Sequence, residues 1–221
     1  VGNFNILSHL YTQLRILGIK EIVMCIGHFS LKIKKYVKNH IMDDSNRILK
    51  IIKKKTNNNH VKVLFSYSNA NSSTSKRLKK VKKIIKNRNI VLLYGDTLLK
   101  ISKNNFKSNK KNINLIDIIL TVSNPPEKFG VAKFKKEKLI SYNEKKINKN
   151  KWVNSGWMFL NNSVFKFINK VDLNFEQYIL NNTKKFDIRV SKNKYFYLPI
   201  DNIYDLNTAK LAWKNSRKTW Y

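Results

Sequence analysis

The sequence has few of the residues that cross-link or interrupt a chain. It contains one cysteine, six glycines and three prolines among 221 residues. A single cysteine, Cys25, excludes an internal disulfide framework and a cysteine-based zinc cluster. No apolar run approaches the roughly 18 residues of a membrane span, so we expect no membrane insertion. The first residues also lack the basic start and apolar stretch of a signal peptide, which favours a cytoplasmic location.

Acidic residues are also scarce, and their scarcity gives the chain an extreme charge. Thirteen Asp and Glu face 45 Lys and Arg, for a formal net charge of +32. Such a charge suggests a polyanion partner, such as nucleic acid or an anionic membrane. Only six of the basic residues are arginines, although Arg is the better residue for bidentate phosphate and base recognition.

The residues used most heavily, Lys, Asn and Ile, are those that A/T-rich codons specify. Two interpretations of the charge therefore stay open: compositional drift of the solvated surface, and a selected polyanion-binding face. Lysines gathered on one face would favour binding, whereas lysines on all exposed faces would favour drift.

The hydrophobic pattern predicts an α/β fold with enough apolar residues for a core, since 42% of the chain is hydrophobic. Short apolar runs predict strands, and helical periodicity predicts helices between them. In the first part we expect strands at 19–26, 61–67, 90–94 and 114–122, helices at 7–17, 30–37 and 74–87, and mainly a connection over 41–59 with a short helix at 48–52. In the second part we expect a hairpin at 129–143, strands at 152–160 and within 186–198, and helices after 164 and at 175–181 and 205–214.

Alternating strands and helices indicate an open, largely parallel sheet. Such sheets bind ligands outside the carboxyl ends of their strands. Asp96 follows the strand at 90–94 and is expected at that edge, where its carboxylate suits a Mg²⁺ ion that carries a phosphate. An ordinary turn aspartate is the alternative interpretation. Cys25 is expected in a buried strand, as an inert thiol.

Eight short segments occur in an order and spacing that resemble the sugar-1-phosphate nucleotidyltransferases. They are Leu-Gly-Ile-Lys-Glu-Ile-Val (17–23), Arg-Leu-Lys-Lys-Val (77–81), Tyr-Gly-Asp (94–96), Pro-Pro-Glu-Lys-Phe-Gly (125–130), Tyr-Asn-Glu-Lys (142–145), Asn-Ser-Gly-Trp (154–157), Leu-Pro-Ile-Asp (198–201) and Lys-Thr-Trp (218–220). Each segment is weak alone, but together they span nearly the whole chain. The second and the last are similar to the glucose-1-phosphate cytidylyltransferase branch in particular.

The resemblance implies a three-layer, Rossmann-like nucleotidyltransferase fold with a mostly parallel central sheet. It implies a single domain over 1–221, whose part from 125 to 221 carries the sugar-phosphate half. The family opens with a strand and a Gly-rich loop that cradles the triphosphate, and this chain begins with a segment that resembles the stretch just after them. We therefore expect a fragment that lacks the first, central strand and that loop, and we assign no catalytic residue.

The activity that the resemblance implies is transfer of a nucleotidyl group to a sugar 1-phosphate with release of pyrophosphate. For the cytidylyltransferase branch the substrates are CTP and glucose 1-phosphate, and the product, CDP-glucose, feeds deoxysugar and surface-polysaccharide pathways. A fragment should be impaired in this reaction. The alternatives are a uridylyl- or thymidylyltransferase for another hexose 1-phosphate, and a non-catalytic remnant or basic nucleic-acid-binding protein. No specific nucleic-acid partner is expected, and a homo-oligomer stays open.

The resemblance also implies roles for particular residues. Asp96 and Asp201 match the two metal-binding aspartates of the family and would together hold one Mg²⁺ against the triphosphate. Because the two residues lie far apart in the sequence, this role requires the fold to bring both carboxylates to the same edge of the sheet.

The other matched residues belong to the substrates. Glu144 and Lys145 match a pair that binds the sugar hydroxyls and the sugar phosphate. Asn154 and Gly130 match residues near the sugar. Arg77 matches an arginine near the nucleotide, although the two glycines that usually precede it are Ser and Lys here.

Overall fold

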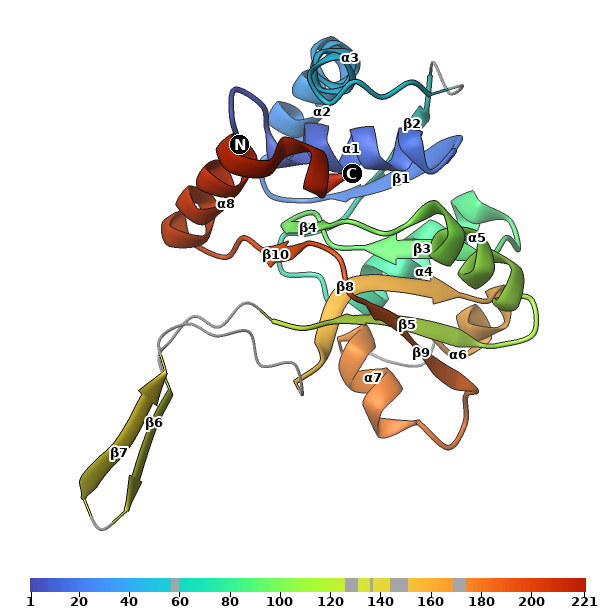
Figure 1. Cartoon of the computed structure of the whole chain (residues 1–221). Helices are drawn as coiled ribbons and strands as arrows, with labels where there is room; N and C mark the ends of the chain where they lie inside the picture. Colours follow the sequence, from blue (N-terminus) through green and yellow to red (C-terminus); the bar gives the residue numbers. More distant parts are fainter. Residues whose placement is uncertain (57–59, 126–130, 136, 144–150, 169–173) are drawn as a thin grey trace.

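A computed structural model describes the fold of this chain for residues 1–56, 60–125, 131–135, 137–143, 151–168 and 174–221. The first elements are α1 (Ile6–Ile16), β1 (Glu21–Ile26), α2 (Ser30–Asn39), α3 (Ile41–Ile51), β2 (Lys62–Tyr67), α4 (Thr74–Ile85), β3 (Ile90–Leu93), β4 (Thr97–Leu99), α5 (Lys103–Asn112) and β5 (Ile118–Ser123). Their alternation is visible in Figure 1 and agrees with the α/β pattern predicted from the sequence.

The second part of the chain contributes more strands and the helices that cover them. Its elements are β6 (Val131–Lys135), β7 (Lys138–Asn143), β8 (Val153–Leu160), the 3₁₀ turn η1 (Asn162–Val164), α6 (Phe165–Ile168), α7 (Phe175–Asn181), β9 (Ile188–Asn193), β10 (Tyr197–Pro199), α8 (Ile203–Ser216) and the 3₁₀ turn η2 (Arg217–Trp220). Strands β6 and β7 form an antiparallel hairpin, as the sequence predicted for this segment.

The strands pair mainly in two sheets. Strands β1 and β2 pair in parallel, with Glu21 opposite Lys62 and Ile26 opposite Tyr67. The larger sheet has the order β3-β8-β5-β9. Within it β8 runs antiparallel to both of its neighbours, whereas β9 is parallel to β5. The larger sheet is therefore mixed, although β3, β5 and β9 all point the same way.

The two sheets lie edge to edge in one layer. Val23 of β1 and Leu92 of β3 pack against the same buried cluster, and Ile22 and Val91 pack against a second cluster. Even so, no strand pairing joins β1 to β3 among the described residues.

Helices cover both faces of this layer and complete a three-layer fold. On one face α4, α6 and α7 bury Leu78, Phe165 and Phe175 in a common cluster. On the other face Leu14 of α1 and Phe106 of α5 pack in another. The expected three-layer, Rossmann-like arrangement is confirmed. Within the described part of the chain, no helix is both long and apolar enough to cross a membrane.

Two helices differ from the sequence prediction, for different reasons. Helix α3 occupies much of the expected connection and buries Ile41, Ile48 and Leu49. These apolar residues recur at helical spacing, but the five consecutive polar residues at 43–47 interrupt the pattern. Helix α5 buries Phe106 as its only apolar side chain, so it shows almost no hydrophobic period. Ser102 begins it by accepting a hydrogen bond from Asn105 N at 3.1 Å.

Exposed lysines occur on both helical layers. Lys79 and Lys83 are exposed on α4, and Lys107 and Lys111 are exposed on α5, which cover opposite faces of the sheet. This distribution is the one expected of compositional drift rather than of a single polyanion-binding face.

The expectation that Cys25 is buried is wrong, since its side chain is exposed. It is the penultimate residue of β1 and lies near the carboxyl edge of the sheet, beside the following loop. The apolar run that predicted this strand continues to the edge of the sheet. An apolar run therefore does not show that Cys25, which lies near that edge, is buried.

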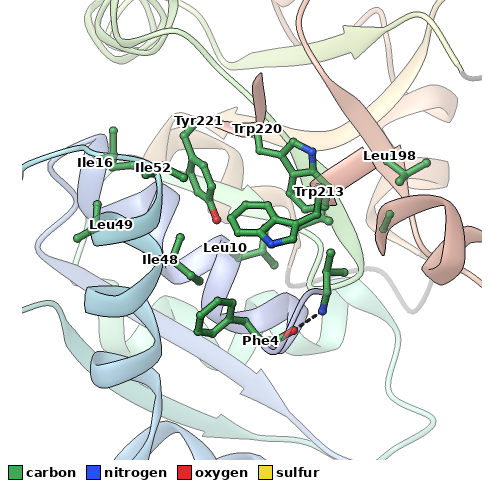
Figure 2. Packing of buried hydrophobic residues seen from close by; sticks show 13 residues of the cluster. Phe4, Leu10, Ile16, Ile48, Leu49, Ile52, Leu198, Trp213, Trp220 and Tyr221 are labelled. Atoms are coloured by element: carbon green, nitrogen blue, oxygen red, sulfur yellow. Dashed lines mark hydrogen bonds between the residues drawn. The ribbon is translucent and has the colours of Figure 1, made fainter. Parts of the chain in front are cut away.

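The carboxyl-terminal residues close a second core against α1 and α3. Trp213 of α8, Trp220 and Tyr221 are all buried and cluster with Leu10 and Ile48 (Figure 2). The ring of Trp213 meets that of Trp220 edge-on, with their centroids 5.2 Å apart. Aromatic side chains bury large apolar areas, so this cluster ties the end of the chain to its first helix.

A buried histidine sits inside the aromatic cluster. His9 Nδ1 lies 2.6 Å from the Tyr221 hydroxyl and Nε2 lies 3.1 Å from the Val1 carbonyl oxygen. Because a carbonyl only accepts, Nε2 carries the proton of the neutral ring, and Nδ1 accepts from Tyr221. Burial lowers the pKa of His9 from 6.5 to about 4, although the bond to Val1 opposes the shift.

This arrangement predicts a loss of stability at mildly acidic pH. A histidine with a lowered pKa in the folded state binds its proton more readily after unfolding. Its contribution is unaffected above pH 6.5, and stability falls as the pH drops from 6.5 to 4. The loss from this one group should reach about 3 kcal/mol. Urea denaturation between pH 4 and 7, compared with His9→Gln, measures it.

The exposed His60 provides the control for this experiment. His60→Gln should keep the pH dependence of the parent chain, whereas His9→Gln should lose the part between pH 6.5 and 4. Equal pH slopes for the parent and His9→Gln would show that the buried histidine does not control acid stability.

Candidate functional site

A short antiparallel ribbon brings Asp96 and Asp201 together. Strand β4 pairs with β10, and Thr97 lies opposite Pro199. Just beyond this pair, Ile200 N donates a hydrogen bond to the Asp96 carbonyl oxygen at 2.9 Å. Both aspartates are exposed and flank the same end of the ribbon. The structure therefore brings the two aspartates to the same end of the ribbon, and their joint binding of a metal stays a prediction.

Neighbouring side chains contact both aspartates, at the carboxylate of Asp96 and at the backbone of Asp201. Thr97 Oγ1 donates to Asp96 Oδ1 at 3.2 Å. Asp205 Oδ2 accepts from Asp201 N at 3.1 Å, while Asn202 Oδ1 accepts from Asp205 N at 3.0 Å. These two bonds begin helix α8 much as a capping box does, except that Asp205 accepts from the N–H of Asp201 rather than from that of the N-cap residue Asn202. Asp201 is thus fixed at the point where the ribbon ends and the helix starts.

Tyr197 lies between the aspartates and β8, and sequence reasoning missed it. Burial raises its pKa, and the negative charges of Asp201 and Asp96 raise it further. Both carboxylates are therefore within electrostatic range of one phenol. Its hydroxyl also lies 3.5 Å from the Asn154 carbonyl oxygen. The available signal was the strand period of two, which puts residues 197 and 201 on the same side of an extended segment.

Asn154 belongs to the same neighbourhood through the irregular start of β8. Its Oδ1 accepts a hydrogen bond from Gly156 N at 2.9 Å. The Gly156 carbonyl oxygen in turn accepts from Tyr94 N at 3.1 Å, which joins β8 to the loop that carries Asp96. The structure thus brings Asn154, Asp96 and Asp201 around Tyr197.

Gly156 allows this close approach. Its φ is +75°, and a Cβ there would lie 3.0 Å from Tyr94 Cδ2 and 3.4 Å from Thr97 Oγ1. Residues with a side chain rarely adopt such a φ, and both contacts are tighter than ordinary packing. A glycine is therefore needed for β8 to pass against the loop that holds Asp96.

Arg77 occupies a different part of the carboxyl edge. Its guanidinium donates to the carbonyl oxygens of Ser72 at 3.2 Å and Ala70 at 3.1 Å. The same group lies beside Gly27, at the end of β1. Arg77 thus shapes the loop that follows β2. Its place near the nucleotide stays a prediction, and these hydrogen bonds join it to the loop backbone.

The remaining predicted residues, Gly130, Glu144 and Lys145, lie outside the described residues. Their roles with the sugar phosphate stay predictions.

The donor set at the ribbon fits magnesium better than zinc. The described residues contain no group of three or more His, Cys, Asp or Glu that could hold a metal. Zinc sites use three or four protein ligands. Magnesium instead takes one or two carboxylates and keeps waters and phosphate oxygens. The exposed carboxylates of Asp96 and Asp201 are such a pair.

Comparison with known families identifies the family of this chain and supports its fold. The model of the family described as nucleotidyl transferase matches residues 1–215. The chain belongs to the nucleotidyl transferase family. The resemblance inferred from the eight segments is therefore confirmed at the level of the family.

Two curated relatives indicate the range within the family. The chain is 23% identical to the glucose-1-phosphate cytidylyltransferase of Salmonella typhimurium, over 100% of this chain and 88% of that protein. It is 25% identical to the D-glycero-alpha-D-manno-heptose 1-phosphate guanylyltransferase of Campylobacter jejuni, over 83% of this chain and 74% of that protein.

A solved structure supports the fold. The protein is from Bacillus anthracis and is named for glucose-1-phosphate thymidylyl transfer. It superposes with a TM-score of 0.70 at 15% identity, covering 97% of this chain and 85% of that one. At this identity the likeness establishes the fold alone.

The contacts of Gly156 predict a measurable cost for Gly156→Ala. The substitution adds backbone strain at positive φ and crowds Tyr94 and Thr97. We expect a loss of about 1–3 kcal/mol in unfolding free energy, measured by urea denaturation.

Gly18→Ala is the matched control for this substitution. Gly18 has a φ of +78° but nothing within 4 Å of a built Cβ, so its variant carries the strain without the crowding. Gly156→Ala should therefore cost more than Gly18→Ala. Equal losses would mean that β8 does not press against the Asp96 loop.

Proposed function

We propose that this chain forms CDP-glucose and pyrophosphate from CTP and glucose 1-phosphate, for deoxysugar or surface-polysaccharide biosynthesis. The observation that carries the proposal is the junction of Asp96 and Asp201 at the end of the β4–β10 ribbon, beside Asn154. The choice of CTP and glucose 1-phosphate is supported by the likeness to cytidylyltransferases over the full length of the chain.

The proposed reaction is an in-line displacement at phosphorus. An anionic oxygen of glucose 1-phosphate attacks the α-phosphorus of CTP and forms a new P–O bond. The bond between the α-phosphorus and the bridging oxygen to the β-phosphate breaks, and pyrophosphate leaves with its electrons. Such a reaction needs alignment and charge neutralisation more than proton transfer.

The described residues supply part of that alignment. Asp96 and Asp201 would hold Mg²⁺, whose chemistry is to neutralise phosphate charge. Asn154 Oδ1 already accepts from Gly156 N, so its Nδ2 is the atom that it can offer to a sugar hydroxyl. The Tyr197 hydroxyl lies 3.5 Å from the Asn154 carbonyl oxygen and within electrostatic range of both carboxylates. In the proposal, Glu144 binds sugar hydroxyls, Lys145 binds the sugar phosphate and Gly130 lies near the sugar.

The nucleobase would lie near the loop that follows β2. Arg77 orders this loop through the carbonyl oxygens of Ser72 and Ala70. In this arrangement Arg77 acts on the nucleotide through the loop backbone.

A second candidate function keeps the chemistry and changes the nucleotide or the sugar. The relatives include a guanylyltransferase and a protein named for thymidylyl transfer. A metal held by two carboxylates serves any nucleoside triphosphate equally well, because it contacts phosphate and not base. A uridylyl- or thymidylyltransferase for another hexose 1-phosphate is therefore the alternative.

A nucleotide panel tests the proposed specificity. The chain is incubated with Mg²⁺, glucose 1-phosphate and one of CTP, UTP, dTTP or GTP, and the nucleotide sugar is measured by anion-exchange chromatography. We expect kcat/KM for CTP to exceed each other value by at least about tenfold, because cytosine and uracil present different hydrogen-bonding groups. A preference for UTP or dTTP would favour the alternative. A chain that also carries the family's Gly-rich loop is assayed in parallel, because a fragment should be impaired in this reaction. No product from either chain with any nucleotide would contradict nucleotidyl transfer.

Removal of either carboxylate tests the metal site. Asp96→Asn and Asp201→Asn should each lower Mg²⁺-dependent product formation on the order of 100-fold, since a preorganised electrostatic contact to the transition state is lost. Titration calorimetry with Mn²⁺ and CTP should show weaker metal-dependent nucleotide binding in both variants. Asp187→Asn is the control, because Asp187 is an exposed acid that pairs with Arg189 at 3.3 Å. Unchanged metal dependence in both site variants would remove these residues from the metal site.

A further inference from the structure

A basic concavity of about 510 Å³ lies at the end of α8 that is remote from Asp201. Helices α3 and α8, the turn η2 and the first residues of the chain border this open hollow. Its lining residues are Gly2, Asn3, Phe4, Arg47, Ile51, Lys210, Trp213, Lys214 and Arg217. Neither the proposed reaction nor the family resemblance uses any of them for binding or chemistry.

The floor of this concavity belongs to the carboxyl-terminal core. Trp213 and Phe4 are both buried there (Figure 2). A Cβ at Gly2 would lie 2.7 Å from Trp213 Nε1, so the backbone closes directly against the indole. The guanidinium of Arg47 lies 5.1 Å from the centre of the Phe4 ring, a cation–π distance. The contacts of Trp213 and Phe4 therefore fix the floor and one side of the concavity.

Four cations, and no acidic residue, line the concavity. They are Arg47 from α3, Lys210 and Lys214 from α8, and Arg217 from η2. Arg47 also pairs with Asp44 at 3.8 Å, but 63% of its side chain remains exposed. Like charges that converge on one hollow repel each other, and an anionic ligand would relieve that repulsion.

The kind of cation distinguishes this hollow from the rest of the surface. The chain has six arginines among 45 basic residues, and compositional drift supplies lysine almost everywhere. Here two of the four cations are arginines. Arginine presents a planar fork that matches phosphate, and it is the favoured residue for phosphate recognition.

We propose that this basic concavity binds a phosphorylated small molecule of nucleotide or sugar-phosphate size. A volume of about 510 Å³ falls within the range of small-molecule sites, which is roughly 300–1,000 Å³. Lys210 and Lys214 lie on the order of 15–20 Å from Asp201 along the helix axis, at 1.5 Å per residue. The concavity is therefore a second site, and the proposal stands independently of the proposed reaction.

Titration calorimetry with inorganic pyrophosphate and with ADP tests this site. The buffer contains EDTA and about 150 mM salt, which removes metal-dependent binding and screens diffuse surface charge. The test variant is Lys214→Gln with Arg217→Gln. The control is Lys79→Gln with Lys83→Gln, which removes the same charge from exposed positions of α4. A third protein, Asp96→Asn, tests independence from the metal site.

We expect the parent chain, the α4 control and Asp96→Asn to bind ADP with affinities within about twofold of each other. The concavity variant should bind at least about tenfold more weakly, since two charge-assisted contacts are lost. Circular dichroism verifies that each variant is folded. The proposal is overturned if the parent binds neither probe, if both lysine-containing pairs weaken binding equally, or if Asp96→Asn abolishes it.

Discussion

The pairing of β4 with β10 is the constraint on which the candidate site depends. It consists of three residue pairs, from Thr97 opposite Pro199 to Leu99 opposite Tyr197. A single backbone hydrogen bond contributes only about 0.5–1.5 kcal/mol net, so this ribbon would not persist alone. Leu98 and Leu198 anchor it, because both are buried in the carboxyl-terminal core. The position of the two carboxylates therefore depends on the packing of Leu98 and Leu198 in the carboxyl-terminal core.

Helix α8 transmits that packing to both proposed binding regions. Its first turn is fixed by Asn202 and Asp205, next to Asp201. Farther along, Trp213 joins Trp220 and Tyr221 in the core that contains apolar residues of α1 and α3. The lysines of the basic concavity project from this same stretch. One helix thus follows the proposed metal-binding carboxylate at its start and carries part of the proposed phosphate site near its end.

Sequence patterns predicted the elements whose burial is periodic and missed those whose contacts are few. The apolar runs at 19–26 and 61–67 became β1 and β2 because alternate residues enter buried clusters on both faces of the sheet. Helix α5 has one buried apolar side chain, so no period could reveal it. Strand β4 is only three residues long, and its partner lies near the other end of the chain.

The residues of the candidate site also divide into those that the sequence predicted and those that it missed. Asp96, Asp201 and Asn154 were predicted from the order of motifs, and the fold brings them to one neighbourhood. Tyr197 was missed, since its importance arises from burial beside two carboxylates and not from a motif. Arg77 was predicted near the nucleotide, but its bonds to loop carbonyls depend on how the segment after β2 turns back.

The sequence by itself determined the family, the α/β alternation and the residue types that handle phosphate, because these depend on local periodicity and on motifs of a few residues. Only the tertiary structure decided which distant groups meet. Three contacts join segments from different parts of the chain. They are the hydrogen bond from Ile200 N to the Asp96 carbonyl oxygen, the contact of His9 with the terminal aromatic residues, and the lining of one concavity by Arg47 and Arg217. Such contacts depend on how the helices and strands pack, and the spacing of residues along the chain does not predict that packing.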